Sequence, residues 1–159
     1  MEQQFLGKQS ISFKEPVYIQ GFASVVGKKE GEGPLRECFD QVEEDEKFGK
    51  KTWEEAESML QQRTARLAVE KTGIQTEEIR MIFAGDLLAQ SIASSFGIGE
   101  LDRPLYGLFG ACSTMGEALS LSSMMVAGGY GDRVLAVTSS HFATAEKEFR
   151  FPLGYGSQR

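Results

Sequence analysis

Cysteine, histidine and tryptophan are scarce in this chain of 159 residues, which has two cysteines, one histidine and one tryptophan. The two cysteines, Cys38 and Cys112, lack the paired spacing of a zinc site or a disulfide framework. No stretch approaches the roughly 18 consecutive apolar residues that indicate a membrane-spanning helix. We therefore expect no metal site, no disulfide and no transmembrane segment.

Basic residues are also in the minority, because 17 Lys and Arg against 23 Asp and Glu give a formal net charge of −6. Proteins that bind nucleic acid need clustered Lys and Arg to contact its phosphates, so nucleic acid is not an expected partner. A small anionic ligand is still compatible with the acidic balance, because backbone N–H groups can hold an anion locally. The length fits a single domain.

Short apolar runs alternate with longer helical segments along the chain, as in α/β proteins. Strands are predicted at residues 16–26, 80–84, 105–109 and 133–138, and helices at residues 53–71, 87–96 and 113–128. Thr52 and Glu55 form the signature of a capping box, and Gly73 fits the end of that first helix. Residues 28–33 and 41–51 are predicted to be polar loops. The alternation predicts one mostly parallel sheet that contains all four strands.

One segment places a cysteine between a strand and a helix. Residues 110–114 read GACST; they follow the apolar run 105–109 and precede the predicted helix. Free N–H groups at a helix N-terminus favour the thiolate, which is the reactive form of cysteine. Cys112 is therefore either a reactive thiol or a structural one, since free cysteine is often buried. The residues alone leave both interpretations open.

The helix after Cys112 is apolar around its whole circumference. Between Thr114 and Gly129 the only charged residue is Glu117. A helix on the outside of a sheet has a polar face, whereas an apolar helix is buried on all sides. We therefore expect a sheet on each side of this helix, or a second chain, although the predicted strands make only one sheet.

Two further polar residues follow predicted strands. Asp86 comes after the strand at residues 80–84, and His141 comes after the strand at residues 133–138. Open α/β sheets hold ligands at the carboxyl ends of their strands, where Cys112 is also expected. Asp86 fits equally well as a helix N-cap, and His141 as an ordinary hydrogen-bonding residue. The convergence of three strand ends, more than any single residue, predicts a ligand site.

The chain resembles the stage V sporulation protein AD family in four motifs, which are AGDLL at 84–88, LFGACST at 108–114, TSSHFATAE at 138–146 and FRFP at 149–152. Two earlier segments, EGEGPL at 30–35 and WEEAE at 53–57, are also similar. The resemblance implies a thiolase-like fold of two similar βαβαβαβ halves packed as five layers. Residues 1–159 correspond to the first half, with the central buried helix starting after Cys112. We expect a truncated copy, a gene fragment or half of a split protein.

The resemblance implies a sporulation protein that binds dipicolinic acid, or its calcium salt, and takes part in its uptake into the developing spore. Asp86, Cys112, Ser113 and His141 are expected in the pocket. Ser113 would donate its hydroxyl and N–H, and His141 a ring N–H. Cys112 would form part of the wall or act as a weak donor. No cofactor is implied. The expected partners are proteins of the same spore membrane uptake system and a second copy of the chain, and the expected location is the cytoplasm or the periphery of the spore inner membrane.

The alternative is an acyltransferase of the condensing-enzyme class, with Cys112 as the nucleophile that takes an acyl group from acyl-coenzyme A. The catalytic His and Asn groups of those enzymes come largely from the second half of the fold. Because His141 is the only histidine here, we favour a non-enzymatic binding protein. A third interpretation is that the half fold has no independent function. The aromatic residues Phe149, Phe151 and Tyr155 are expected to pack on the absent half.

Overall fold

The computed structural model describes residues 5–88 and 91–146. Its strands are β1 (Phe5–Leu6), β2 (Ser10–Ile11), β3 (Val25–Gly27), β4 (Gln41–Glu43), β5 (Met81–Gly85), β6 (Leu105–Leu108) and β7 (Val134–Thr138). Its α-helices are α1 (Lys28–Gly31), α2 (Trp53–Thr72), α3 (Ile92–Gly97) and α4 (Thr114–Ala127). Short 3-10 helices are η1 (Arg36–Cys38), η2 (Thr76–Glu78), η4 (Gly99–Leu101) and η5 (Ala111–Ser113). Residues 149–155, which include the FRFP motif and the predicted aromatic strip, lie outside the described part.

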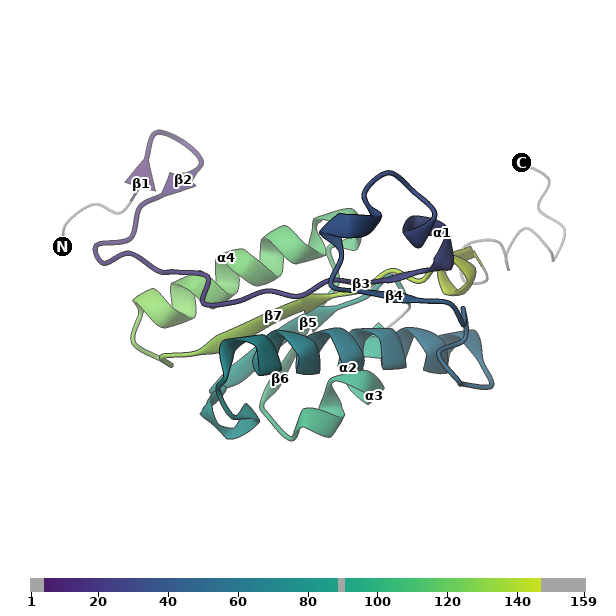
Figure 1. Ribbon diagram of the computed structural model, residues 1–159. Helices are drawn as coiled ribbons and strands as arrows, with labels where there is room; N and C mark the ends of the chain where they lie inside the picture. The colour runs from purple at the N-terminus through teal and green to yellow at the C-terminus, as the bar shows by residue number, and fades with distance from the viewer. Residues whose placement is uncertain (1–4, 89–90, 147–159) are drawn as a thin grey trace, which may run out of the picture.

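The main sheet has three parallel strands in the order β6-β5-β7, with helices on both faces (Figure 1). The central strand β5 is buried along its whole length, and its side chains alternate between the two faces. Ile82 and Ala84 pack in one cluster with Ala65 and Val69 of α2. The odd-numbered side chains of β5 face the other way and pack with α4. The predicted α/β class with a mostly parallel sheet is therefore confirmed.

Helix α2 follows its predicted signals. Thr52 Oγ1 accepts the Glu55 N–H at 3.2 Å, and Glu55 Oε2 accepts the Thr52 N–H at 3.1 Å, so the capping box is complete. Gly73 ends the helix in the left-handed conformation, with φ of 71°. Glycine adopts this conformation without the steric cost that a Cβ would add. The boundaries of α2 were thus readable from local sequence.

The first predicted strand, at residues 16–26, is mostly wrong. Only Val25–Gly27 forms a strand, and it pairs in parallel with β4, which lies in the segment predicted as the loop 41–51. Residues 16–24 have no partner strand within the described ranges, and Tyr18 is 80% exposed. A backbone forms a strand only where a neighbour pairs with its N–H and C=O groups. The predicted loop 28–33 begins with the short helix α1.

The four predicted strands therefore do not form one sheet. The β3–β4 pair is a separate two-stranded sheet, and Val25 of β3 packs with Ala56 and Leu60 of α2. The N-terminal hairpin of β1 and β2 stands apart from the main sheet (Figure 1). The pairing of β3 with β4 depends on how the rest of the chain packs, so the local pattern of the first 50 residues did not predict it.

The expected burial of the helix after Cys112 on all sides is not found in the described residues. Ala118 is fully buried against the sheet, whereas Met115, Leu119 and Met124 are 38–40% exposed on other faces of α4. The main sheet covers one side of the helix, and the β3–β4 pair packs on α2 instead. The helix is apolar all round, but only part of its surface is covered here. None of the described helices is both long and apolar enough to cross a membrane.

Candidate functional site

The three strand ends converge as predicted. In the register of the sheet, Gly85 of β5 lies beside Leu108 of β6 and Thr138 of β7. Asp86 directly follows Gly85, the GACST turn follows β6, and the segment that contains His141 follows β7. All three segments therefore leave the carboxyl edge of the same parallel sheet, which we call the rim. This is the edge at which α/β proteins of this kind hold ligands.

Close packing at Gly85 fixes the GACST turn against the central strand. A Cβ at this glycine would lie 2.3 Å from the Leu108 carbonyl oxygen and 2.4 Å from Thr114 Cγ2, so no larger residue fits without a shift. Thr114 is 1% exposed. Its Oγ1 accepts the Gly110 N–H at 3.1 Å and donates to the Ala111 carbonyl at 2.8 Å. The turn that carries Cys112 is thus held at both ends.

Asp86 is buried, and its carboxylate accepts hydrogen bonds from the turn that it begins and from Ser94 of α3. Its Oδ1 accepts the Leu88 N–H at 2.9 Å, and its Oδ2 accepts the N–H and the hydroxyl of Ser94 at 2.7 and 2.5 Å. The predicted helix 87–96 therefore begins only at Ile92, because the carboxylate folds residues 86–88 into a turn first. Asp86 lies outside α3 but accepts the N–H of Ser94, the third residue of that helix, as a capping residue would. The N-cap position itself belongs to Ser91, which makes no side-chain cap.

Cys112 lies exposed in η5, directly before α4. The preceding residue, Ala111, has a φ of 48°, a left-handed conformation that is costly for a residue with a Cβ. The two donors that were expected of Ser113 both have internal partners. Its hydroxyl donates to the Gly110 carbonyl at 2.7 Å, and its N–H donates to the same oxygen at 3.0 Å.

The ring of His141 is fixed by segments far away in sequence. Its Nε2 lies 2.7 Å from the Glu46 carbonyl oxygen, and since a carbonyl only accepts, Nε2 carries the proton. The ring centroid of Trp53 lies 5.5 Å from the His141 ring, and that of Phe48 lies 6.5 Å away. Nδ1 is buried and has no hydrogen-bond partner within residues 5–88 and 91–146. Only a protonated imidazole has a second N–H, at Nδ1, for a ligand.

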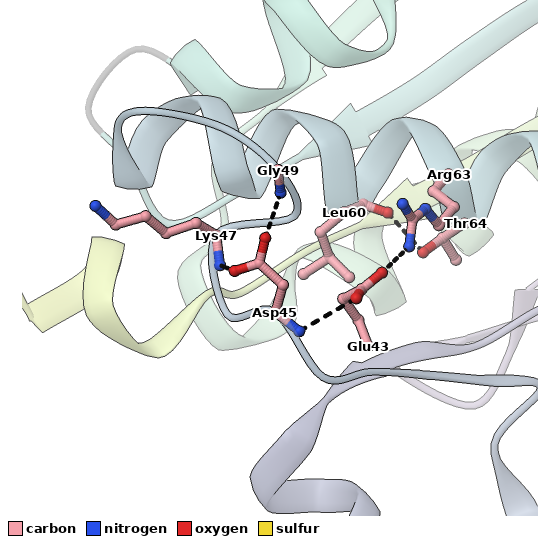
Figure 2. Close-up of polar contacts among 7 residues, drawn as sticks. All are labelled: Glu43, Asp45, Lys47, Gly49, Leu60, Arg63 and Thr64. Carbon is pink, nitrogen blue, oxygen red and sulfur yellow. Dashed lines mark hydrogen bonds and ion pairs between the residues drawn. The ribbon is translucent and has the colours of Figure 1, made fainter.

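The predicted solvated loop at 41–51 is wrong at Gln41–Glu43, which form β4, whereas most of the segment after β4 is exposed, as predicted, and is ordered by its own side chains. Asp45 accepts the N–H groups of Lys47 and Gly49 at 3.0 and 2.7 Å. Glu43 accepts the Asp45 N–H at 3.2 Å and pairs with Arg63 of α2 (Figure 2). Charged residues can order a loop when they cap its backbone, and composition alone does not show this. The ordered loop presents the Glu46 carbonyl to His141.

Sequence analysis missed two residues of the rim, Glu57 and Gln61, which lie one turn apart on α2. Both are fully buried. Glu57 Oε1 accepts the Ser139 hydroxyl at 2.9 Å, directly after β7. Gln61 Nε2 donates to the Gly85 carbonyl at 3.0 Å and to Ser94 Oγ at 3.1 Å. In sequence they stand among the charges of an amphipathic helix, and only the position of α2 against the sheet shows that they face inward.

Burial raises the pKa of Glu57 to about 7, chiefly because the charged form loses its hydration. The charge of nearby Asp86 raises it further, whereas the hydrogen bond from Ser139 lowers it. Glu57 Oε2 and Gln61 Oε1 are buried oxygens without a hydrogen-bond partner among the described residues. Such atoms are rare in proteins and often mark functional positions.

No group of three or more His, Cys, Asp or Glu residues that could hold a metal ion occurs in the described part of the chain. An open groove of about 400 Å³ lies between α2 and α3, and its walls include Met59, Gln62 and Phe96. None of Asp86, Cys112, Ser113 or His141 lines it. We place the candidate site at the rim, because the strand ends and the unpaired buried polar atoms lie there.

The parallel sheet with helices on both faces defines an α/β protein, and the polar residues at its carboxyl edge make the rim the candidate site. Residues 7–159 match the family model for stage V sporulation protein AD. The chain belongs to this family. It is 38% identical over 153 residues to stage V sporulation protein AD of Bacillus subtilis (strain 168). The aligned region covers 96% of this chain and 45% of that protein. The chain thus spans less than half the length of this curated relative.

Two solved structures are similar to part of the chain. One is 3-oxoacyl-[acyl-carrier-protein] synthase III from Aquifex aeolicus VF5, with a TM-score of 0.49 and 17% identity over 54% of this chain and 30% of that chain. The other is the priming β-ketosynthase of the R1128 polyketide biosynthetic pathway, with a TM-score of 0.46 and 19% identity over 60% of this chain and 31% of that chain.

Proposed function

We propose that this chain provides part of a binding site for dipicolinic acid, or its calcium salt, and serves the uptake of that compound into the developing spore. The observation that carries the proposal is the convergence of three strand-end segments on one rim in a chain of the stage V sporulation protein AD family. Dipicolinate is a flat aromatic ring with two carboxylates. Such an anion fits the N-terminus of a helix, and α4 begins at the rim.

The rim residues have different tasks in this proposal. Asp86 is fully engaged by Leu88 and Ser94, so it shapes the site rather than touching the anion. Cys112 is exposed and forms a wall of the site. His141, when protonated, provides an N–H from Nδ1 to a carboxylate. A calcium ion carried with the ligand would reduce the repulsion between dipicolinate and the acidic groups nearby.

Partners and location belong to the same proposal and come from family membership. We propose that the chain works with the other proteins of the spore membrane uptake system, at the periphery of the spore inner membrane or in the cytoplasm. A second copy of the chain is a further proposed partner. Because the chain covers 45% of its curated relative, groups from outside these 159 residues would complete the pocket.

Calorimetric titration with dipicolinate, with and without calcium, tests the binding proposal. We expect saturable binding that Cys112→Ala weakens at least fivefold. The matched control is Cys38→Ala, because Cys38 is also an exposed free thiol but lies far along the chain in η1. Circular dichroism checks that both variants fold. An absence of binding at millimolar ligand, or equal weakening by both substitutions, would overturn the proposal.

The acyltransferase alternative is favoured by one observation, the exposed thiol of Cys112 next to the left-handed Ala111. Strained residues of this kind are concentrated at functional sites. In this alternative the Cys112 thiolate attacks the thioester carbonyl of acyl-coenzyme A, and coenzyme A leaves as its thiolate. Mass spectrometry after incubation with acetyl-coenzyme A would then show one acetyl group on Cys112 and none on Cys38. No label, or equal labelling of both cysteines, excludes the alternative.

A further inference from the structure

Helix α2 has a buried polar stripe where it crosses the rim. Three residues on its inner face, Ala56, Glu57 and Gln61, are fully buried, and two of them are polar. A buried carboxyl and a buried amide each cost stability unless their hydrogen bonds are made. Both side chains bind the segments that leave the sheet, so the stripe connects parts of the rim that are more than 50 residues apart in sequence.

On the side of β5, a directional chain of hydrogen bonds leads from α2 to Asp86. The Gln61 amide donates to Ser94 Oγ at 3.1 Å, and the Ser94 hydroxyl in turn donates to Asp86 Oδ2 at 2.5 Å. The same Gln61 amide donates to the Gly85 carbonyl at 3.0 Å, at the last residue of β5. Gln61 therefore fixes both the strand end and the turn that follows it.

On the side of β7, the N-terminal half of α2 holds the segment of residues 139–144. Ser139 donates its hydroxyl to Glu57 Oε1 at 2.9 Å. Thr144, which is 1% exposed, donates its hydroxyl to the Trp53 carbonyl at 2.9 Å. The imidazole of His141 lies between these anchor points, against the Trp53 ring.

We propose that Glu57 is the positioning residue of the rim. Its carboxyl group holds the segment of residues 139–144 against α2, beside the Asp86 turn, through the hydrogen bond with Ser139, and so determines the position of His141. We call this contact the latch, and residues 139–144 the latched segment. Nothing in its local sequence distinguishes Glu57 from the exposed glutamates of the same helix. Its assignment rests on its complete burial, on its bond to Ser139 and on the unpaired Oε2 that faces inward.

The latch is expected to respond to pH. The charged group that acts on Glu57 is Asp86, in the turn after β5, while Ser139 donates its hydroxyl to the carboxyl group from the segment itself. Burial of the carboxyl group raises the pKa of Glu57 from 4.5 to about 7, whereas the hydrogen bond from Ser139 lowers it and so favours the charged form. Glu57 therefore changes its charge near neutral pH. We expect its contact with the segment, and with it the surroundings of His141 and Trp53, to change over this range.

Trp53 is a built-in reporter, because it is the only tryptophan in the chain and contacts the latched segment. We expect its fluorescence to change between pH 5 and 9 with a midpoint near 7. In Glu57→Gln, which keeps an oxygen acceptor for Ser139 but cannot ionise, the transition should disappear. In Ser139→Ala, which removes a bond that favours the charged form, the midpoint should move upward.

His141→Asn is the control that separates the two titratable groups near Trp53. The transition should persist in this variant, because Glu57 is unchanged. A transition that survives in Glu57→Gln, or that disappears in His141→Asn, would assign the signal to His141 and overturn the proposal. Should Glu57→Gln fail to fold by circular dichroism, the direction of the midpoint shift in Ser139→Ala decides instead, and no upward shift overturns it.

The consequence for ligand binding rests on the proposed function, whereas the fluorescence test needs no ligand. If dipicolinate binds at the rim, Glu57→Ala should weaken binding about tenfold and Glu57→Gln less than threefold, and the pH dependence of binding should follow the Trp53 midpoint. If Glu57→Ala and the wild type bind dipicolinate equally well, Glu57 does not contribute to the ligand site. Failure of all variants to bind would count against the proposed function and leave the fluorescence result intact.

Discussion

Single residues at the rim differ most in how far water reaches them. Cys112 is exposed, whereas Glu57 and Asp86 are almost completely buried a short distance along the same edge of the sheet. Exposed groups can meet a ligand directly. Buried groups act through the backbone segments that they hold, and at this rim they hold the turn after β5 and the segment after β7.

The buried carboxyl of Glu57 should make the free energy of unfolding depend on pH. Its pKa is raised from 4.5 to about 7 in the folded chain, so the folded state keeps a proton that the unfolded state has lost between these values. Stability should therefore be greatest below pH 4.5 with respect to this group, and fall by on the order of 3 kcal/mol as pH rises through 7.

Urea denaturation at pH 5 and pH 8 measures this effect. Glu57→Gln should lose most of the decrease in stability that the wild type shows between the two pH values. Carboxyl groups whose pKa is lowered, such as those of Asp40 and Asp45, lose their contribution only at more acidic pH and do not disturb the comparison. A decrease of equal size in the variant would contradict the prediction.

Asp86 should behave as a structural residue when it is removed. Asp86→Ala leaves the N–H groups of Leu88 and Ser94 and the Ser94 hydroxyl without their acceptor. We expect a loss of about 3 kcal/mol in the free energy of unfolding. The control is Asp132→Ala, at an exposed position, which should change stability by less than about 0.5 kcal/mol. Equal effects of the two substitutions, measured by urea denaturation, would show that the buried bonds of Asp86 contribute little.

At the scale of elements, the contact between β5, β6 and the start of α4 is the tightest point of the rim. Gly85→Ala would place a Cβ 2.3 Å from the Leu108 carbonyl oxygen, which belongs to the backbone and cannot move aside easily. We expect this substitution to cost about 3 kcal/mol and to shift the GACST turn.

Gly116→Ala is the matched control for this prediction. It adds the same methyl group inside α4, where nothing lies within 4 Å of the new atom. Alanine is the better helix former by about 1 kcal/mol, so this variant should be as stable as the wild type or more so. Thermal melts of the two variants compare them directly. A Gly85→Ala protein that melts like Gly116→Ala would contradict the packing described here.

For the whole molecule, the apolar surface of α4 is the feature with the widest consequences. Met115, Leu119 and Met124 are each more than one-third exposed, although the opposite face of the helix packs on the sheet. Apolar patches of this kind promote association between molecules. We expect the chain to self-associate as its concentration rises, and the double substitution Leu119→Lys and Met124→Lys to reduce this.

Sedimentation velocity between 5 and 200 μM, as an order-of-magnitude range suited to weak contacts, would measure the association. The control is Ser120→Lys, which adds a charge to an exposed position of α4 but leaves the apolar side chains in place. It should retain most of the association if the apolar contact dominates. A double variant that associates as strongly as the wild type would show that α4 is not the surface involved.

Local signals in the sequence were sufficient for some elements and insufficient for others. Thr52, Glu55 and Gly73 determined the ends of α2, because caps act within one turn of backbone. The apolar runs of β5, β6 and β7 identified the strands of the main sheet, because each run is continuous in sequence and β5, the central strand, is buried along its length. Of the strand predicted at residues 16–26, only the end that pairs with β4 forms, because a strand needs a partner and its apolar pattern does not show where that partner lies.

The sequence by itself determined the α/β class, the meeting of three strand ends at one rim and the family, because each of these follows from contiguous motifs. The order of the strands in the sheet came only from the tertiary structure. Only the tertiary structure decided that Glu57 and Gln61 face the rim, that Glu46 binds His141 and that Asp86 is buried by its own turn. These contacts join residues from different elements. Their geometry follows from how α2 and the loop after β4 pack against the sheet, which no single segment of the sequence specifies.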